Sequence, residues 1–347
     1  DVTTAKNTGV EKINNINVST TSATKSAAKA AIDQAAKTKD DAIDASNLTD
    51  EEKDTLKKTV DAEGQKAKDK IDAATKDADV KTAQTNGEKA INAVEIPASV
   101  SKTDAINAIN AALADKKAAI NGTNLTDEEK TALVNQAQKL DDDAIANINK
   151  ATTNDAVKTA KENGVEAINA VEIPTSSKTK NDANSDLDNT ADAAKKAIDE
   201  TSGLTDDQKQ TAKDQIDTAV GDAQENIKKA SDNQDVADAK DAGKLAIDKV
   251  SAKAAIDAAL NNKKSAIAKA PLTAEEAKPL NDLVDQEADA AKAAIDDATT
   301  NAVVEAAKNN GVEKINNINV PTTSATKDAA NKAIENALAI KIEEIIA

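Results

Sequence analysis

Apolar side chains recur along the chain at the spacing of one face of a helix. Between residues 100 and 175 they follow one another at steps of 3, 4 or 7 positions in three separate runs. Such steps place the apolar residues on one stripe of an α-helix. The pattern predicts three amphipathic helices here, with stripes formed by Ile106, Ile109, Leu113 and Ile120, by Leu133, Ala137, Leu140, Ala144 and Ile148, and by Val157, Ala160, Gly164, Ile168 and Val171.

Polar caps and a helix breaker separate these helices. Ser101 or Thr103 can cap the start of the first, and Thr126 with Glu129 is spaced for a capping box at the start of the second. Pro174 follows the third helix and is expected to stop it. The acids of the Thr126-to-Glu129 motif would lie in the first helical turn, at the positive end of the helix dipole. We therefore expect this motif to be structural, and not a carboxylate cluster for a cation.

Two sequence markers repeat this three-helix pattern along the chain. In-helix glycines are separated by 78, 77, 79 and 68 residues, and a Leu-Thr motif, usually followed by acids, precedes each of the last four by 39 residues. The period predicts four complete repeats. The markers are Gly9, Gly87, Gly164, Gly243 and Gly311, and the motifs that begin at Leu48, Leu125, Leu204 and Leu272. The expected segments are the end of a preceding repeat at 1–20, three-helix repeats at 21–97, 98–174 and 175–250, a shortened three-helix repeat at 251–320, and the first helix of a following repeat at 321–347.

The fourth repeat lacks nine residues, and their position is informative. Alignment of the repeats places the gap opposite Glu95 to Thr103, which is a whole linker including its proline. What remains, from Val236 through Ala268, contains no proline, and its only glycine is the in-helix Gly243. The sequence therefore predicts one continuous helix shared by the third and fourth repeats.

The number of helices in a repeat bears on the fold. Three antiparallel helices bring the chain into a repeat at one end and out at the other, so tandem repeats must string out. The predicted fold class is all-α, with tandem three-helix bundles stacked end to end into an elongated rod. We expect this rod to be a monomer whose contacts are mainly between adjacent repeats of the same chain.

The repeated glycine has its own explanation. A glycine inside a helix costs roughly 1 kcal/mol relative to alanine, so something must offset it. Gly164 lies on the apolar stripe between Ala160 and Ile168. We expect a close crossing of two helices at this point, with a helix kink and a ligand contact as the alternatives.

The amino-acid composition excludes most kinds of catalytic chemistry. The chain has no Cys, His, Met, Trp, Tyr or Phe, and all 45 of its basic residues are lysines. Thiol and imidazole catalysis, thiolate or histidine metal sites and arginine clamps for phosphate are therefore closed to it. The sequence predicts no enzyme activity, no catalytic, cofactor-binding or metal site, no cofactor and no small-molecule ligand.

The charge and hydropathy of the chain limit the kinds of partner that it can bind. The formal net charge is −17, which repels nucleic acids and anionic membrane surfaces. No apolar run approaches the roughly 20 residues that cross a bilayer. We expect neither nucleic-acid binding nor membrane insertion.

The combined motifs resemble a known repeat family. They are Asn-Leu-Thr-Asp-Glu-Glu-Lys at 47–53 and 124–130, the run from Ile148 to Val157, and the run from Ala160 to Gly164. Together they resemble the DUF1542-type helical repeats of Gram-positive cell-wall-anchored surface proteins, and the resemblance spans essentially the whole chain. It implies an extracellular location on the bacterial cell surface and offers no established active site to carry over. The chain, which starts at Asp1, is expected to be part of a longer protein whose signal and anchoring segments lie outside it.

Two functions fit these observations. The first is a non-catalytic structural stalk of a surface adhesin, which projects adhesive domains away from the cell wall. The alternative is a helical adhesion module that itself binds a host or cell-surface protein. The sequence favours the stalk, because most positions outside the apolar stripes are Lys, Asp, Glu, Asn or Thr and the aromatic residues and arginine that dominate binding hot spots are missing. Only weak contacts with host proteins are expected.

Overall fold

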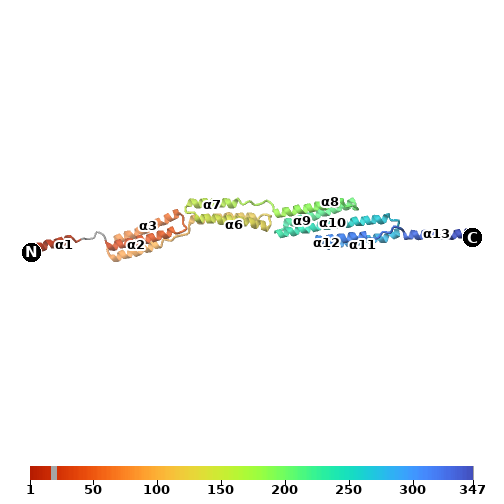
Figure 1. Ribbon diagram of the computed structural model, residues 1–347. Coiled ribbons are helices and arrows are strands. Elements are labelled where there is room, and N and C mark those ends of the chain that lie inside the picture. The colour runs from red at the N-terminus through yellow and green to blue at the C-terminus, as the bar shows by residue number, and fades with distance from the viewer. Residues whose placement is uncertain (17–21, 347) are drawn as a thin grey trace. The chain divides into compact units, whose positions relative to one another are not determined.

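The structure is a computed structural model that describes residues 1–16 and 22–346, which form thirteen helices and no strand (Figure 1). The all-α fold class predicted from the sequence is confirmed. Residues 17–20 of the first expected segment, residue 21 of the expected repeat 21–97 and residue 347 of the last segment lie outside the described residues. The helices are α1 (Val2–Asn14), α2 (Ala23–Asp44), α3 (Asp50–Ala73), α4 (Asp77–Asn92), α5 (Val100–Asn121), α6 (Asp127–Lys150), α7 (Asn154–Asn169), α8 (Lys178–Glu200), α9 (Asp206–Lys229), α10 (Asn233–Lys269), α11 (Ala274–Asp296), α12 (Asn301–Asn316) and α13 (Ala325–Ile346).

The chain divides into two compact units. Unit 1 comprises Asp1–Gly122 and Leu133–Ile173, and unit 2 comprises Thr123–Ala132 and Pro174–Ala347. The boundary therefore falls inside α6.

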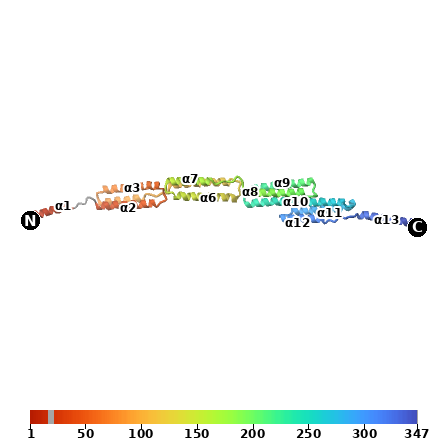
Figure 2. The ribbon, with the colours of Figure 1, turned by 45° about the horizontal axis from the view of Figure 1, so that its top comes forward.

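Unit 1 contains two groups of helices, each with its own core. In bundle 1, α2 and α3 lie side by side and α4 packs against both (Figures 1 and 2). Bundle 2 is formed by α5, α6 and α7. Isoleucine fills the centre of both cores, with alanine beside it, because the apolar stripes of the helices face inward as their spacing predicts. The fully buried isoleucines are Ile32, Ile43, Ile71 and Ile91 in bundle 1, and Ile109, Ile120, Ile148 and Ile168 in bundle 2.

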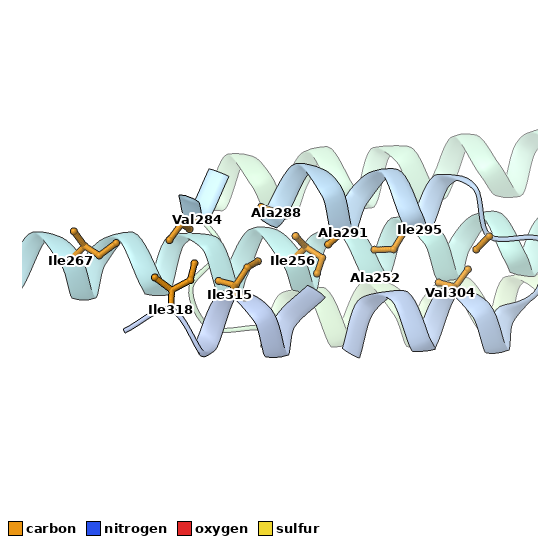
Figure 3. Packing of buried hydrophobic residues seen from close by; sticks show 12 residues of the cluster. Ala252, Ile256, Ile267, Val284, Ala288, Ala291, Ile295, Val304, Ile315 and Ile318 are labelled. Carbon is orange, nitrogen blue, oxygen red and sulfur yellow. The ribbon is translucent and has the colours of Figure 1, made fainter. Parts of the chain in front are cut away.

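Unit 2 also has two cores, and both include α10. In bundle 3, α8 and α9 pack against the first part of α10, and in bundle 4, α11 and α12 pack against its second part. Figure 3 shows Ile256 of α10 pointing toward Ala291 and Ile315 of its neighbours. The helix is continuous over 37 residues, which confirms the shared helix predicted from the sequence. Near its middle Ala252 belongs to one core and Ala254 to the other.

Four of the five repeated glycines lie at close helix crossings, as predicted for Gly164. A Cβ atom added to Gly164 would lie 2.5 Å from the Cβ of Ala144 and 2.7 Å from the Cδ1 of Ile109. Both distances are shorter than any normal van der Waals contact. Gly87, Gly243 and Gly311 meet an alanine and an isoleucine or leucine in the same way. Gly9 of α1 has nothing within 4 Å of such an atom.

Two expected helix boundaries were wrong. The first helix of bundle 2 begins at Val100 and is capped by Ser99, two residues before Ser101 and four before Thr103, the two caps expected from the sequence. The third helix ends at Asn169, five residues before Pro174, so the proline does not stop it. The Nζ of Lys116 instead donates to the backbone oxygens of Asn169 and Val171, at 2.9 and 3.0 Å, and so satisfies the helix end.

Candidate functional site at the bundle junctions

Buried polar side chains show where the described part of the chain departs from a simple apolar core. Apart from Asp141, all of them lie near a helix start, either in the turn before the second helix of a bundle or at the start of the first helix of the next one: Thr49, Ser99, Lys102, Thr126, Ser177, Lys180 and Ser324. Among residues 1–16 and 22–346, no three His, Cys, Asp or Glu side chains gather in a group that could hold a metal ion. None of the helices there combines the length and apolar character of a membrane span. The junctions are therefore the candidate functional sites.

The junction between bundles 1 and 2 centres on the carboxylate of Glu52. Its Oε2 accepts from the backbone N of Thr49 at 3.0 Å, while the Oγ1 of Thr49 accepts from the backbone N of Glu52 at 3.3 Å. This is the capping box that the motif predicts. The other oxygen, Oε1, accepts from the backbone N of Ser101 in the next bundle at 3.1 Å. One side chain thus satisfies the amide ends of two helices in different bundles.

The two residues before Glu52 contact the next bundle as well. The backbone N of Asp50 donates to the carbonyl oxygen of Thr152 at 2.7 Å, in the turn between α6 and α7. The Oε2 of Glu51 accepts from the backbone N of Asn154 at 3.0 Å, at the start of α7. The first turn of α3 therefore faces the turn between α6 and α7 and is hydrogen-bonded to it through Asp50 and Glu51.

A buried lysine completes the junction from the other bundle. Lys102 is only 4% exposed, and its Nζ donates to the Oδ1 of Asn47 at 2.8 Å and to the carbonyl oxygen of Asn149 at 2.9 Å. Burial lowers the pKa of Lys102, as does the charge of Lys53, while Glu52 and Asp50 oppose that shift. The lysine ties the turn before α3 to the carboxyl end of α6.

Unit 2 contains the same arrangement at its first junction. The backbone N of Thr179 donates to the Oε1 of Glu129 at 3.1 Å, and the Nζ of Lys180 donates to the Oδ1 of Asn124 at 3.2 Å and the carbonyl oxygen of Lys228 at 3.1 Å. The flanking contacts are also repeated, from the N of Asp127 to the oxygen of Ser231 at 2.9 Å and from the N of Asn233 to the Oε2 of Glu128 at 3.0 Å.

A partial third copy joins bundle 4 to α13. The carboxylate of Glu276 accepts from the Oγ of Ser324 at 2.7 Å and from the backbone N of Thr326 at 2.9 Å. The Nζ of Lys327 donates to the carbonyl oxygen of Pro271 at 2.8 Å. The hydroxyl of Ser324 and the amides of Thr273 and Thr326 lower the pKa of Glu276 to about 2.

The other two junction glutamates are held ionised in the same way. Burial alone would raise the pKa of Glu52, but the bonds from Thr49, Ser99 and Ser101 outweigh it and lower the value to about 2. Burial also opposes a lowered pKa at Glu129, where bonds from Thr179, Thr126 and Ser177 prevail. The carboxylates therefore keep their charge and their acceptor capacity through the whole neutral and mildly acidic range.

Lysines on the first helix of a bundle satisfy the carboxyl ends of its other helices. One set reaches the carboxyl end of the second helix: Lys25 to Asp72, Lys102 to Asn149, Lys180 to Lys228 and Lys249 to Asp296. A second set, fourteen residues further along, reaches the end of the third helix: Lys39 to Asn92, Lys116 to Asn169 and Lys263 to Asn316. In bundle 3 this position is Ala194, and there the third helix continues as α10.

The joint between bundles 3 and 4 uses different contacts. Gln208 replaces the glutamate, and its Oε1 accepts from the Nδ2 of Asn261 at 2.7 Å. The same nitrogen lies 2.9 Å from the carbonyl oxygen of Gly203, the residue that takes a left-handed turn with φ of 92°. Asn261 lies well inside α10, so the two bundles overlap along the shared helix instead of meeting at a linker.

Sequence reasoning identified the capping box but missed its partners. The predicted role of Thr126 and Glu129 is confirmed by bonds of 3.0 and 3.4 Å. The second glutamate oxygen and the buried lysine were not foreseen. A signal for them exists, because Ser-x-x-Lys recurs at the start of the first helix of repeats 1, 2 and 3 and of α13, at residues 22–25, 99–102, 177–180 and 324–327.

These features define a tandem helical-repeat protein whose repeats are joined by a recurring polar junction. Comparison with family models places four matches in sequence order, at residues 24–99, 101–176, 179–251 and 248–323. All four are to the Domain of Unknown Function DUF1542, and the chain belongs to this family. The third and fourth matches overlap within α10. Neither a curated protein nor a solved structure matches the chain.

Proposed function

We propose that the chain is a non-catalytic stalk of a bacterial surface adhesin, with its repeats supplying length between the cell wall and an adhesive domain. The observation that carries this proposal is the recurring junction. Wherever this junction recurs, its glutamate accepts hydrogen bonds from the start of the next first helix in the same chain, which supports a role in joining successive repeats. The family membership supports a repeat region of a surface protein, and the extracellular, wall-anchored location is part of the proposal.

The proposed repeats are 21–97, 98–174, 175–250 and 251–320, arranged as a monomeric rod. A bundle about 36 Å long, set by the 24 residues of α6 at 1.5 Å per residue, would give four bundles a length on the order of 150 Å. Small-angle X-ray scattering of the whole chain tests the proposal. A compact chain of this size would have a radius of gyration of about 20 Å, and finding that value would overturn it.

An adhesion module is the second candidate, and one surface feature favours it. Val100 is 65% exposed beside a shallow groove at the first junction, which is lined by Leu48, Leu56 and Pro97 among others. At the next junction the position of Val100 is occupied by Lys178. Submicromolar binding of a host matrix protein that Val100→Lys abolishes would support adhesion over the stalk, whereas the stalk proposal expects no saturable binding.

A further inference from the structure

Asp141 of α6 is the one buried acid in the described cores. Its side chain is 2% exposed, and its Oδ2 accepts from the Nε2 of Gln138 at 3.1 Å, while its Oδ1 has no hydrogen-bond partner. The three other repeats place residues without a carboxylate at this position, Gly64, Val220 and Ala288. Bundle 2 therefore holds a carboxylate where its relatives hold no charge.

The charges around Asp141 do not neutralise it directly. On α5 the Nζ of Lys117 donates to the Oε1 of Gln138 at 2.7 Å, so glutamine stands between the lysine and the acid. On α6 itself, Asp142 also accepts from Gln138 and adds a like charge. In bundle 4 the positions of Lys117 and Gln138 are occupied by Lys264 and Asp285. These two form a direct ion pair, with 2.5 Å between the Nζ of Lys264 and the Oδ1 of Asp285.

This environment penalises the charged form of Asp141 relative to an exposed aspartate. Burial raises the pKa of Asp141, as does the charge of Asp142, while Lys117 and Gln138 lower it less. A carboxyl whose pKa is higher in the folded chain than in the unfolded chain binds its proton more tightly when folded. Folding is then destabilised at neutral pH and regains stability as the pH falls through the folded value.

We propose that Asp141 makes bundle 2 an acid-stabilised element of the chain, which opens more readily at neutral pH than in mild acid. This inference stands apart from the stalk proposal, since it concerns one bundle and requires no particular reach or partner. The junctions flanking the bundle do not reverse the effect, because the carboxylate of Glu52 remains ionised down to about pH 2.

Hydrogen exchange of the whole chain at pH 7 and pH 5 tests the proposal, with rates expressed as protection factors so that the intrinsic pH dependence is removed. In the unmodified chain we expect protection in the buried part of α6 to rise at pH 5. In Asp141→Ala, which copies the residue of bundle 4, protection at pH 7 should rise about tenfold and lose that pH dependence.

Two further variants keep the test decisive. Asp143→Ala removes an exposed acid two residues away and should leave the pH dependence intact. Asp141→Asn resembles the protonated acid in shape and charge, and should also remove the dependence if the alanine variant folds poorly. The proposal is overturned if the unmodified bundle shows no rise at pH 5, or if the loss of the charge at Asp141 leaves protection at pH 7 unchanged or lower.

Discussion

Single residues in this chain affect stability mainly through steric fit, as the glycines within helices demonstrate. Gly164 and Gly64 are both buried and lie within helices, but a Cβ at Gly64 would have ordinary contacts of 3.8 and 3.9 Å with Ile32 and Ile91. A Cβ at Gly164 would lie 2.5 Å from that of Ala144. The two positions therefore separate helix propensity from steric fit.

We predict that Gly164→Ala destabilises bundle 2 by about 1–3 kcal/mol, because the helices must separate to admit the methyl group. Gly64→Ala should instead stabilise bundle 1 by up to about 1 kcal/mol through helix propensity. Thermal melts, with local exchange to identify the bundle affected, measure both. Equal effects of the two changes would contradict the close crossing.

The junction glutamate gives a second prediction at this scale. Glu52→Gln replaces one acceptor oxygen with a donor that faces an amide, and we expect the first turn of α5 to lose about 1–3 kcal/mol of local stability. Exchange at the amide of Ser101 measures this loss. Asp50→Asn, which removes a charge from the same helical turn, is the matched control and should have a smaller effect.

The pH dependence of this junction has a definite sign. The folded pKa of Glu52, about 2, lies below its unfolded value, so its stabilisation is complete above the unfolded value of ~4.3 and is lost as the pH falls toward 2. The Glu52→Gln chain should lack this loss at Ser101. If both chains lose protection there alike, the glutamate does not hold the junction.

Sequence alone could supply only part of this detail. The capping box joins residues three positions apart, so a local pattern reveals it. The bond from Ser101 to Glu52 joins residues 49 apart, and no local pattern pairs them. The recurring Ser-x-x-Lys marks Lys102 but does not predict its burial, which is unusual for a lysine and becomes favourable only once the oxygens of Asn47 and Asn149 meet around it.

At the scale of the helices, their periodicity was predictable and some of their ends were not. The stripe from Ile106 to Ile120 predicts a helix from its spacing alone. The end at Asn169 depends on Lys116, which is contributed by a different helix. The expectation that Pro174 stops this helix was therefore wrong, because the helix end is bonded to a residue of another helix. The continuity of α10 could be predicted, because it required only that no proline or glycine linker interrupt the helix.

The shared helix yields the prediction at this scale. Exchange across 249–254 in α10 should be slower than across 96–101 in the first linker by about a hundredfold or more, because opening α10 breaks helix bonds and exposes two cores. Comparable rates in the two segments would mean that α10 is interrupted in solution.

For the whole molecule, the two kinds of joint predict different cooperativity. Bundles 3 and 4 share α10, so unfolding of this helix takes apolar residues out of both cores at once. We predict that they unfold in a single step in denaturant, while bundles 1 and 2 unfold separately. Native-state hydrogen exchange at increasing urea concentration measures this. The opening free energies of amides in α8, α9, α11 and α12 should converge on one common value as urea rises.

A proline can test that coupling directly. Ser251→Pro, in the middle of α10, removes a helix bond and costs about 3 kcal/mol or more. It should divide the single transition of bundles 3 and 4 into two. Ala98→Pro, in the linker before α5, is the matched change and should leave the transitions of bundles 1 and 2 as they were.

The recurrence of the junction residues also bears on how such a chain can change in length by recombination. Deletion of 99–176 would place Ser177 directly after Ala98 and bring Thr179 and Lys180 to the positions of Ser101 and Lys102. Glu52 and Asn47 would then meet the same types of donor as before, so the shortened gene encodes a junction that already exists. A crossover within α10 has no such equivalent. Bundles 3 and 4 should therefore be inherited as a pair, and gains or losses of single repeats should fall at the linkers that contain proline.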